Sequence, residues 1–259
     1  MAKLLISLLL LLPVVAFTQG YPSFEKKELI RGTDTLRYRV QYPFNYNPSK
    51  KYPLVLFLHG AGERGSDNEL QLAWGAALFA DSNNRAKFPA IVVFPQCRRD
   101  DFWARIARNN NKDSLGGFSF LSNVPVGKSL GLVEQLIDSM AASGKINMKK
   151  IYLGGLSMGG MGTFELLWRK PNFFAAALPI CGGGDPLKPT EWARKFPIWV
   201  FHGEKDPVVP PSNSRLMVHA LKAAKAKVKY SEYPGVLHDS WKNAFAEPEL
   251  LSWLFKQKK

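Results

Sequence analysis

A serine flanked by glycines is the residue of this chain best suited to nucleophilic chemistry. Ser157 lies in the G-x-S-x-G pattern of residues 155–159. The glycines at both ends would let a strand and a helix approach closely enough to form a sharp turn, which a Cβ atom would prevent. Such a turn pushes the serine hydroxyl outward, in front of the free N–H groups at the start of the helix.

The segments on either side of this serine match what a nucleophile turn requires. Residues 151–156 are apolar and strand-like, and residues 163–169 have a helical pattern that Pro171 ends. A G-x-S-x-G pattern alone also occurs in plain turns. The strand before it and the helix after it favour the nucleophile interpretation.

A glycine-rich loop is the second pointer to chemistry. The apolar run 52–58 is of the kind that is buried on both faces of a sheet, and it is followed by His-Gly-Ala-Gly-Glu-Arg-Gly at 59–65. A loop of this type at the carboxyl end of a central strand can present a backbone N–H to an oxyanion. The alternative is an ordinary strand-to-helix turn.

These motifs require a framework of alternating strands and helices. The predicted strands are 24–30, 36–42, 52–58, 90–95, 151–156, 175–181, 198–203 and 228–233, and the predicted helices are 70–79, 126–142, 163–169, a short one near 191–192, 212–226 and 248–256. The alternation predicts an α/β fold: a mostly parallel sheet, an antiparallel N-terminal hairpin, and helices on both faces. The chemistry then belongs at the carboxyl ends of the strands.

Four motifs in order resemble a known family. They are the loop 59–65, the turn 155–160, the segment 201–210 with Asp206, and the segment 235–241 with His238. Together they are similar to the phospholipase/carboxylesterase and predicted-peptidase branch of the α/β-hydrolases. That branch lies near the dienelactone-hydrolase, polyhydroxybutyrate-depolymerase-like and feruloyl-esterase (carbohydrate esterase family one) groups. The resemblance implies an α/β-hydrolase fold from about residue 24 to the C-terminus.

The resemblance also implies a role for each site residue. Ser157 would be the nucleophile, and His238 the base that accepts its proton and later protonates the leaving group. Asp206 would hold the His238 imidazole in the required tautomer. Met158 and Ala61 would supply the oxyanion N–H groups, with Gly60 or Gly62 as alternatives to Ala61.

Other titratable residues compete for these roles. His59 and His202 each precede a glycine at a strand end, where we expect them to support turns. Asp239 adjoins His238, but an immediate neighbour rarely aims its carboxylate at the same imidazole, so Asp206 is the preferred acid. We find no paired metal-ligand spacing and no nucleotide motif, and we expect neither a metal nor a cofactor.

Four residues are candidates for a substrate pocket: Gly62, Arg64, Trp103 and Trp192. Trp103 lies in the stretch 96–125, which lacks clear periodicity and is interpreted as either a substrate-facing insertion or a poorly ordered loop. Trp103 would line the pocket or, as an alternative, fix this loop to the body of the protein. No large helical insert is predicted between residues 177 and 197, so we expect an open cleft without a full lid.

The N-terminus has the pattern of an export signal. Lys3 is followed by an apolar run and then by small residues near Thr18, as in a cleavable signal peptide. We therefore expect a signal peptide at 1–18, one catalytic domain at 19–259, and a secreted or periplasmic product. The apolar run is short for a bilayer span, and no stable membrane anchor is expected.

Charge and cysteine content restrict the possible partners. The formal net charge is +14, spread over dispersed lysines and arginines, which would suit an anionic envelope or an acidic polysaccharide. No nucleic-acid motif accompanies it. Cys97 and Cys181 follow strands that the family topology places about three positions apart, too far for a disulfide, so both are predicted to be free and buried. The oligomeric state is left open.

The sequence therefore favours an exported serine hydrolase that cleaves carboxylic esters through an acyl-enzyme intermediate. Acetyl or feruloyl groups on polysaccharide are the preferred substrate by analogy with the family. The first alternative is a serine peptidase for short peptides, in which Arg64, Arg98 or Arg99 would anchor a peptide terminus. The second is an inactive carbohydrate-binding protein on a hydrolase fold.

Overall fold

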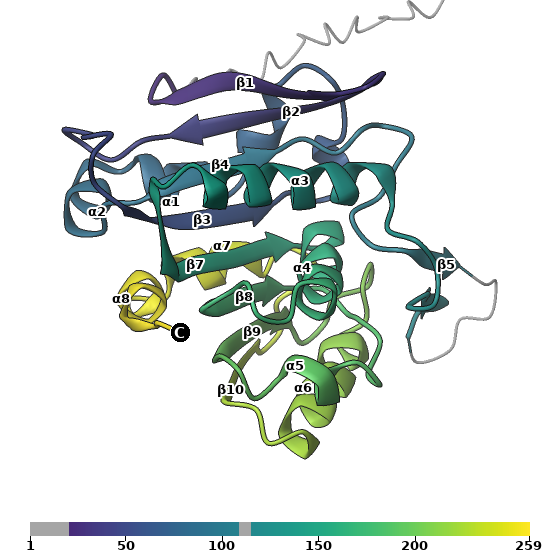
Figure 1. Ribbon diagram of the computed structural model, residues 1–259. Helices are drawn as coiled ribbons and strands as arrows, with labels where there is room; N and C mark the ends of the chain where they lie inside the picture. Colours follow the sequence, from purple (N-terminus) through teal and green to yellow (C-terminus); the bar gives the residue numbers. More distant parts are fainter. Residues whose placement is uncertain (1–20, 109–114) are drawn as a thin grey trace, which may run out of the picture.

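One eight-stranded sheet organises the protein. The computed structural model describes residues 21–108 and 115–259 (Figure 1). The strand order is β1-β2-β4-β3-β7-β8-β9-β10. The bounds are β1 Phe24–Arg31, β2 Asp34–Gln41, β3 Tyr52–Leu58, β4 Ile91–Pro95, β7 Ile146–Leu156, β8 Ala176–Ile180, β9 Ile198–Gly203 and β10 Val228–Tyr233. The predicted α/β fold is confirmed.

The first two strands form the predicted hairpin at one edge of the sheet. They pair antiparallel in register from Phe24–Gln41 to Arg31–Asp34, and Gly32, with φ of +58°, allows the two-residue turn. β2 is also antiparallel to β4, whereas β4, β3, β7, β8, β9 and β10 run parallel. The carboxyl ends of the six parallel strands consequently share one edge.

Helices cover both faces of the sheet, as predicted (Figure 1). The helices are α1 Ala76–Ala80, α2 Ser82–Lys87, α3 Lys128–Ala142, α4 Met158–Arg169, α5 Pro189–Trp192, α6 Ser212–Ala223, α7 Trp241–Ala246 and α8 Leu250–Lys256. Strand β3 shows how the two cores divide: Leu54, Leu56 and Leu58 pack with α3 to α6, while Val55 and Phe57 pack with α1, α7 and α8. Side chains alternate along a strand, so this doubly buried strand is apolar throughout.

The structure corrects one predicted helix and adds one before the predicted final helix, which is confirmed as α8. The segment 70–79 is not one helix but a 3-10 turn, η2 Leu70–Leu72, followed by α1, because Gly75 between them has a φ of +86°. The C-terminal segment holds α7 before α8, with Pro248 in the connection. The extra helix α7 places Trp241 directly behind His238.

The stretch 96–125 is packed on the body of the protein in the part that the structure describes. It contains a small hairpin of β5 Ile106–Arg108 and β6 Phe118–Phe120. Phe118 packs with Met161 of α4 and with Val209, which follows β9. The stretch therefore covers the carboxyl ends of the strands near the first turns of α4.

Both cysteines behave as predicted. Cys97 follows β4 and Cys181 follows β8, and these strands are three positions apart in the sheet. Both thiols are free and buried.

The predicted signal peptide, residues 1–18, lies outside the described residues. Within 21–108 and 115–259, no helix combines the length and the apolar character that crossing a membrane would require.

Candidate active site

Ser157 occupies a strained turn between β7 and α4. Its φ of 54° and ψ of −117° lie outside the regions that L-residues ordinarily adopt. A Cβ atom on Gly155 would lie 2.3 Å from the Gly159 carbonyl oxygen, and one on Gly159 would lie 2.0 Å from the Leu58 carbonyl oxygen. The two glycines therefore let β7, α4 and the end of β3 crowd together, and the turn holds the Ser157 side chain partly exposed.

A chain of hydrogen bonds joins the three residues predicted from separate loops. Ser157 Oγ lies 2.9 Å from His238 Nε2, and His238 Nδ1 lies 2.7 Å from Asp206 Oδ2. The carboxylate fixes the imidazole with its Nδ1 proton toward Asp206, so Nε2 is free to accept the serine proton. The arrangement can perform nucleophilic catalysis with general base assistance.

Asp206 is held as a buried carboxylate. Its Oδ1 accepts the backbone N–H groups of Val208 and Val209, both at 2.9 Å, and its Oδ2 lies 3.2 Å from His202 Nε2. Burial alone would raise the pKa of Asp206, but hydrogen bonds from His202, His238 and Val209 outweigh it and hold that pKa well below its usual range. The site therefore keeps a negative charge next to His238.

The other two strand-end histidines have separate tasks. His59 is buried, which lowers its pKa to about 4, and its neutral ring accepts the Cys97 N–H on Nε2 at 2.9 Å. It supports a turn, as predicted. His202 does more than that, because its ring contacts the carboxylate of Asp206. The four-residue spacing of His202 and Asp206 was the only signal for this contact in the sequence.

The start of α4 and the start of η1 meet at Ser157. Met158 is the first residue of α4, so its N–H has no partner within the helix. Ala61 begins the 3-10 turn η1 Ala61–Glu63, which directly follows β3. A Cβ atom on Gly60 would lie 3.7 Å from Ser157 Cβ, which places the start of η1 beside the serine. The structure thus brings together the segments that contain both predicted oxyanion donors.

Two of the predicted pocket residues are misplaced, because their side chains are in the core. Trp103 has no exposed surface: its Nε1 donates to the His59 carbonyl at 3.0 Å, and its Cβ packs against Gly162. The alternative interpretation, that Trp103 fixes the 96–125 stretch to the body, is the correct one. Trp192 is 1% exposed and stacks on Phe196 beneath α5. Both side chains have large apolar surfaces, and burying those surfaces in the core is more favourable than exposing them in an open cleft.

The other two predicted pocket residues are accessible. Gly62 is exposed within η1, and Arg64 after η1 is half-buried. Arg64 Nε donates to the Ala61 carbonyl at 3.0 Å, so the arginine braces the loop beside Ser157.

An apolar rim surrounds the triad, and the sequence-based interpretation missed it. Val208 and Leu237 are 51% and 55% exposed and adjoin the segments of Asp206 and His238. Trp241 contacts the His238 ring edge to face at 5.6 Å, and Trp74 packs against Trp241 at 5.5 Å. The signal was the position of Trp241, three residues after His238.

A half-buried carboxyl group, that of Glu63, lies next to this site. A Cβ atom on Gly60 would lie 3.0 Å from Glu63 Oε2, and that oxygen has no hydrogen-bond partner among the described residues. Burial raises the pKa of Glu63, against opposing hydrogen bonds from the loop backbone and Trp74. The loop beside Ser157 therefore carries a carboxyl group that favours the neutral form.

One trio of side chains has the composition of a metal site. Ligand atoms of Cys181, Asp206 and His238 lie within 4.8 Å of one another. However, His238 Nδ1 already faces Asp206 in a hydrogen bond, and burial raises the pKa of the Cys181 thiol far above its usual value. A metal would require the deprotonated thiolate. The hydrogen-bonded pair of Asp206 and His238 therefore fits a proton relay better than a metal centre.

The descriptions of similar proteins agree with this geometry. A bifunctional acetylxylan esterase/xylanase from Neocallimastix patriciarum is 27% identical over 226 residues, which are 83% of this chain and 29% of the relative. Acyl-protein thioesterase 1 from Gibberella zeae is 31% identical over 116 residues, 42% of this chain and 47% of the relative. The chain thus spans less than half the length of either relative.

A solved structure matches over nearly the whole chain. A thermostable esterase is 38% identical with a TM-score of 0.79, and the match covers 92% of this chain and 64% of the esterase. The family model described as Phospholipase/Carboxylesterase matches residues 45–248, which contain all three residues of the hydrogen-bonded chain. This protein therefore belongs to the phospholipase/carboxylesterase family and has the α/β-hydrolase fold that its motifs predicted.

Proposed function

We propose that this protein is an exported serine esterase that removes acetyl or feruloyl groups from polysaccharide. The observation that carries the proposal is the continuous chain from Ser157 Oγ through the His238 ring to Asp206 Oδ2, with distances of 2.9 and 2.7 Å. Each link is short enough for proton transfer or charge stabilisation.

In the first half of the reaction, the Ser157 hydroxyl gives its proton to His238 Nε2 while Oγ attacks the ester carbonyl carbon. The carbonyl oxygen becomes an oxyanion, which accepts the N–H groups of Met158 and Ala61. The intermediate collapses as its carbon–oxygen bond to the alcohol breaks, and His238 returns the proton to the leaving alcohol.

In the second half, a water molecule gives a proton to His238 Nε2 and attacks the acyl-enzyme. The acid then leaves, and the proton returns to Ser157 Oγ. Asp206 stays ionised throughout and stabilises the imidazolium that forms in both halves. The depressed pKa of Asp206 suits that role.

The substrate class rests on four supports of different kinds. The acetylxylan esterase relative acts, by its description, on an acylated polysaccharide. The rim of Val208, Leu237, Trp74 and Trp241 would favour an apolar or aromatic acyl group. After β8, the segment 181–197 has the four-residue α5 as its sole helix, so it leaves room for a bulky substrate. The N-terminal export pattern of the sequence would suit such an external substrate.

A paired assay tests this function. The mature protein and Ser157→Ala would be compared on p-nitrophenyl acetate, butyrate and octanoate, on methyl ferulate, and on a peptide anilide. We expect turnover of short esters or ferulate by the wild type, with kcat at least about 10⁴-fold lower in the variant. Labelling of Ser157 by a fluorophosphonate, absent in Ser157→Ala, should accompany that activity.

Turnover of the anilide alone would favour the peptidase alternative. A folded wild-type protein that neither turns over any substrate nor takes up the probe would instead favour an inactive binding protein.

A further inference from the structure

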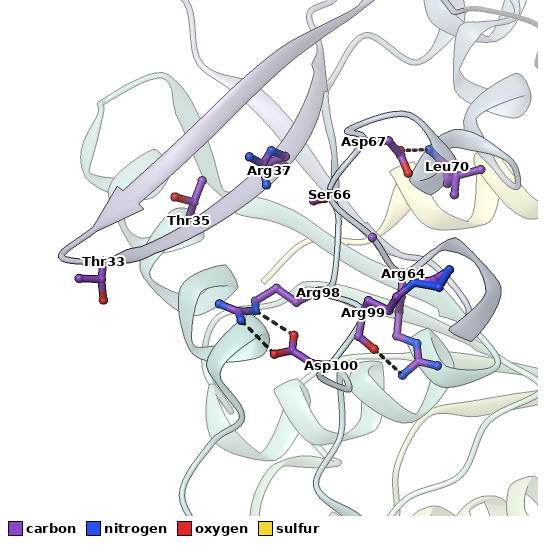
Figure 2. A pocket seen from close by; sticks show the side chains of 11 residues that line it. Thr33, Thr35, Arg37, Arg64, Ser66, Asp67, Leu70, Arg98, Arg99 and Asp100 are labelled. Atoms are coloured by element: carbon purple, nitrogen blue, oxygen red, sulfur yellow. Dashed lines mark hydrogen bonds and ion pairs between the residues drawn. The ribbon is translucent and has the colours of Figure 1, made fainter.

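A pocket of about 860 Å³ lies beside the loop that contains Ala61, on the side of that loop away from Ser157. Three segments form it: residues 33–37 at the start of β2, residues 64–70 after η1, and residues 98–100 after β4 (Figure 2). These segments are distant in sequence, but the Gln96 N–H donates to the Arg37 carbonyl at 2.8 Å and joins two of them. The pocket is thus part of the sheet edge at which Ser157 lies.

Four arginines line this pocket. Arg37 comes from β2, Arg64 from the loop after β3, and Arg98 and Arg99 from the loop after β4 (Figure 2). Guanidinium groups bind carboxylates through paired, planar hydrogen bonds. Such a concentration of arginines in a concave surface therefore favours an anionic ligand.

The two acidic residues of the lining are already occupied. Asp67 Oδ1 accepts the N–H groups of Glu69 and Leu70 at 2.6 and 2.8 Å. Asp100 forms a two-point ion pair with Arg98, at 3.0 and 2.9 Å (Figure 2). Arg37 Nε also pairs with Glu28 Oε1 at 3.0 Å, and Arg98 Nη1 lies 3.5 Å from Asp34 Oδ1. Among the described residues no carboxylate pairs with Arg64 or Arg99, so these two arginines supply the positive charge of the pocket.

Arg64 and Arg99 have different roles: Arg64 is held by the backbone, and Arg99 is accessible to a ligand. Arg64 donates to the carbonyls of Ala61, Arg99 and Asp101, so it joins the loop beside Ser157 to the opposite wall of the pocket. The Arg99 side chain is exposed, and it has no partner among the described residues. Its guanidinium is therefore free to bind a ligand.

The pocket is at a distance from Ser157 that one extended substrate could span. β4 and β7 are separated by β3, so their carboxyl ends are about 10 Å apart at ~4.8 Å per strand. The loop braced by Arg64 lies between the two sites and contacts both. A ligand in the pocket would extend toward the proposed oxyanion donors.

We propose that this pocket binds the carboxylate of a uronic acid residue on the polysaccharide whose acyl ester reacts at Ser157. The proposal rests on the proposed function and names the acidic class of its substrate. The hydroxyl groups of Thr33, Thr35 and Ser66 in the same lining can bind sugar hydroxyls around the carboxylate. The net charge of +14 would attract such a polyanion from a distance.

Calorimetric titration tests the binding without depending on hydrolysis. The ligands are xylotriose bearing a glucuronic acid residue and the same oligosaccharide with its carboxyl group reduced to an alcohol. We expect the acidic form to bind the wild type about tenfold more tightly, as for one charge-assisted hydrogen bond. Arg99→Gln should remove this preference, and 0.5 M NaCl should weaken it.

Arg194→Gln is the matched control, since Arg194 is exposed beside α5, at the opposite end of the sheet, and outside the pocket. It removes the same charge and should keep the tenfold preference. Equal binding of the two oligosaccharides to the wild type would overturn the proposal. So would a preference that survives in Arg99→Gln.

Two further measurements separate the possible failures. Hydrolysis of p-nitrophenyl acetate that depends on Ser157 reports on the esterase function alone. If the wild type has this activity but does not prefer the acidic oligosaccharide, only the pocket assignment is wrong. A peptide with a free terminal carboxylate is titrated in parallel. If it alone binds in an Arg99-dependent manner, the pocket is a peptide anchor and the saccharide proposal is wrong.

Discussion

His202 and His238 contact the same carboxylate oxygen of Asp206, at 3.2 and 2.7 Å. The two rings have different surroundings. His238 faces Ser157, whereas His202 is fully buried and its Nδ1 lies 2.7 Å from Ser214 Oγ. Asp206 is therefore oriented from the core as well as from the site. This makes His202 a positioning residue for the proposed reaction.

Replacing His202 tests that role. His202→Leu removes the Nε2–H group that lies 3.2 Å from Asp206 Oδ2 and 2.9 Å from the Val209 carbonyl oxygen. We therefore expect kcat on p-nitrophenyl acetate to fall at least about tenfold with little change in KM. His202→Gln keeps an N–H near the Nε2 position and should recover most of the loss. A purely structural role would instead lower thermal stability equally in both variants and leave the remaining folded protein fully active.

Glu63→Gln should stabilise the protein at neutral pH. Burial raises the pKa of Glu63, so its folded-state pKa lies above the unfolded value, and the neutral form is the one that the fold favours. Stability from this group is complete below about pH 4.3 and is lost as pH rises through the folded pKa. Glutamine lacks this loss.

The measurement is the midpoint of thermal unfolding between pH 4 and pH 8. The advantage of Glu63→Gln over the wild type should grow as pH rises across that range. Glu191→Gln, which removes an exposed carboxylate on α5, controls for the general loss of charge. A lower midpoint for Glu63→Gln at pH 7 would contradict the prediction.

Gly159→Ala should destabilise the fold. Its Cβ would lie 2.0 Å from the Leu58 carbonyl oxygen, which belongs to a central strand and cannot move away. Overpacking of this kind costs about 3 kcal/mol, or roughly 6–12 °C in Tm for a chain of this size. Gly62→Ala is the matched control, because a Cβ there meets no atom within 4 Å. Its Tm should stay close to that of the wild type.

Neither thiol should react in the folded protein. Burial raises the pKa of Cys97 to about 12 and raises that of Cys181 further, so almost no thiolate is present at pH 8. Titration with a chromogenic disulfide should detect almost no thiol in the native protein and both cysteines in denaturant. Rapid reaction of one thiol in the native state would show that its site opens to solvent.

The sequence by itself determined the strands and the strand-end loops that hold the site residues. Runs such as 52–58 and 198–203 became strands with those bounds, because an apolar run buried on both faces has few other stable conformations. Parallel strands bring their carboxyl ends to one edge, so the loops of Ser157, Asp206 and His238 had to meet. Local pattern and topology were enough for these features.

The sequence predicted helices less well where a single residue decided the outcome. Gly75 divides the segment 70–79 with a positive φ, and the apolar spacing around it gave no sign of the break. Periodicity measures which side chains can share a face, whereas a left-handed backbone at one residue is a property of the turn.

Only the tertiary structure decided which side chains are buried and which form pockets. Trp103 and Trp192 lie in the core, because the surfaces that cover them come from elements distant in the chain. The arginine pocket likewise combines residues 33–37, 64–70 and 98–100, which no local pattern relates. Burial and charge clustering depend on contacts between distant segments, so they follow from the packing of the fold and not from the spacing of residues.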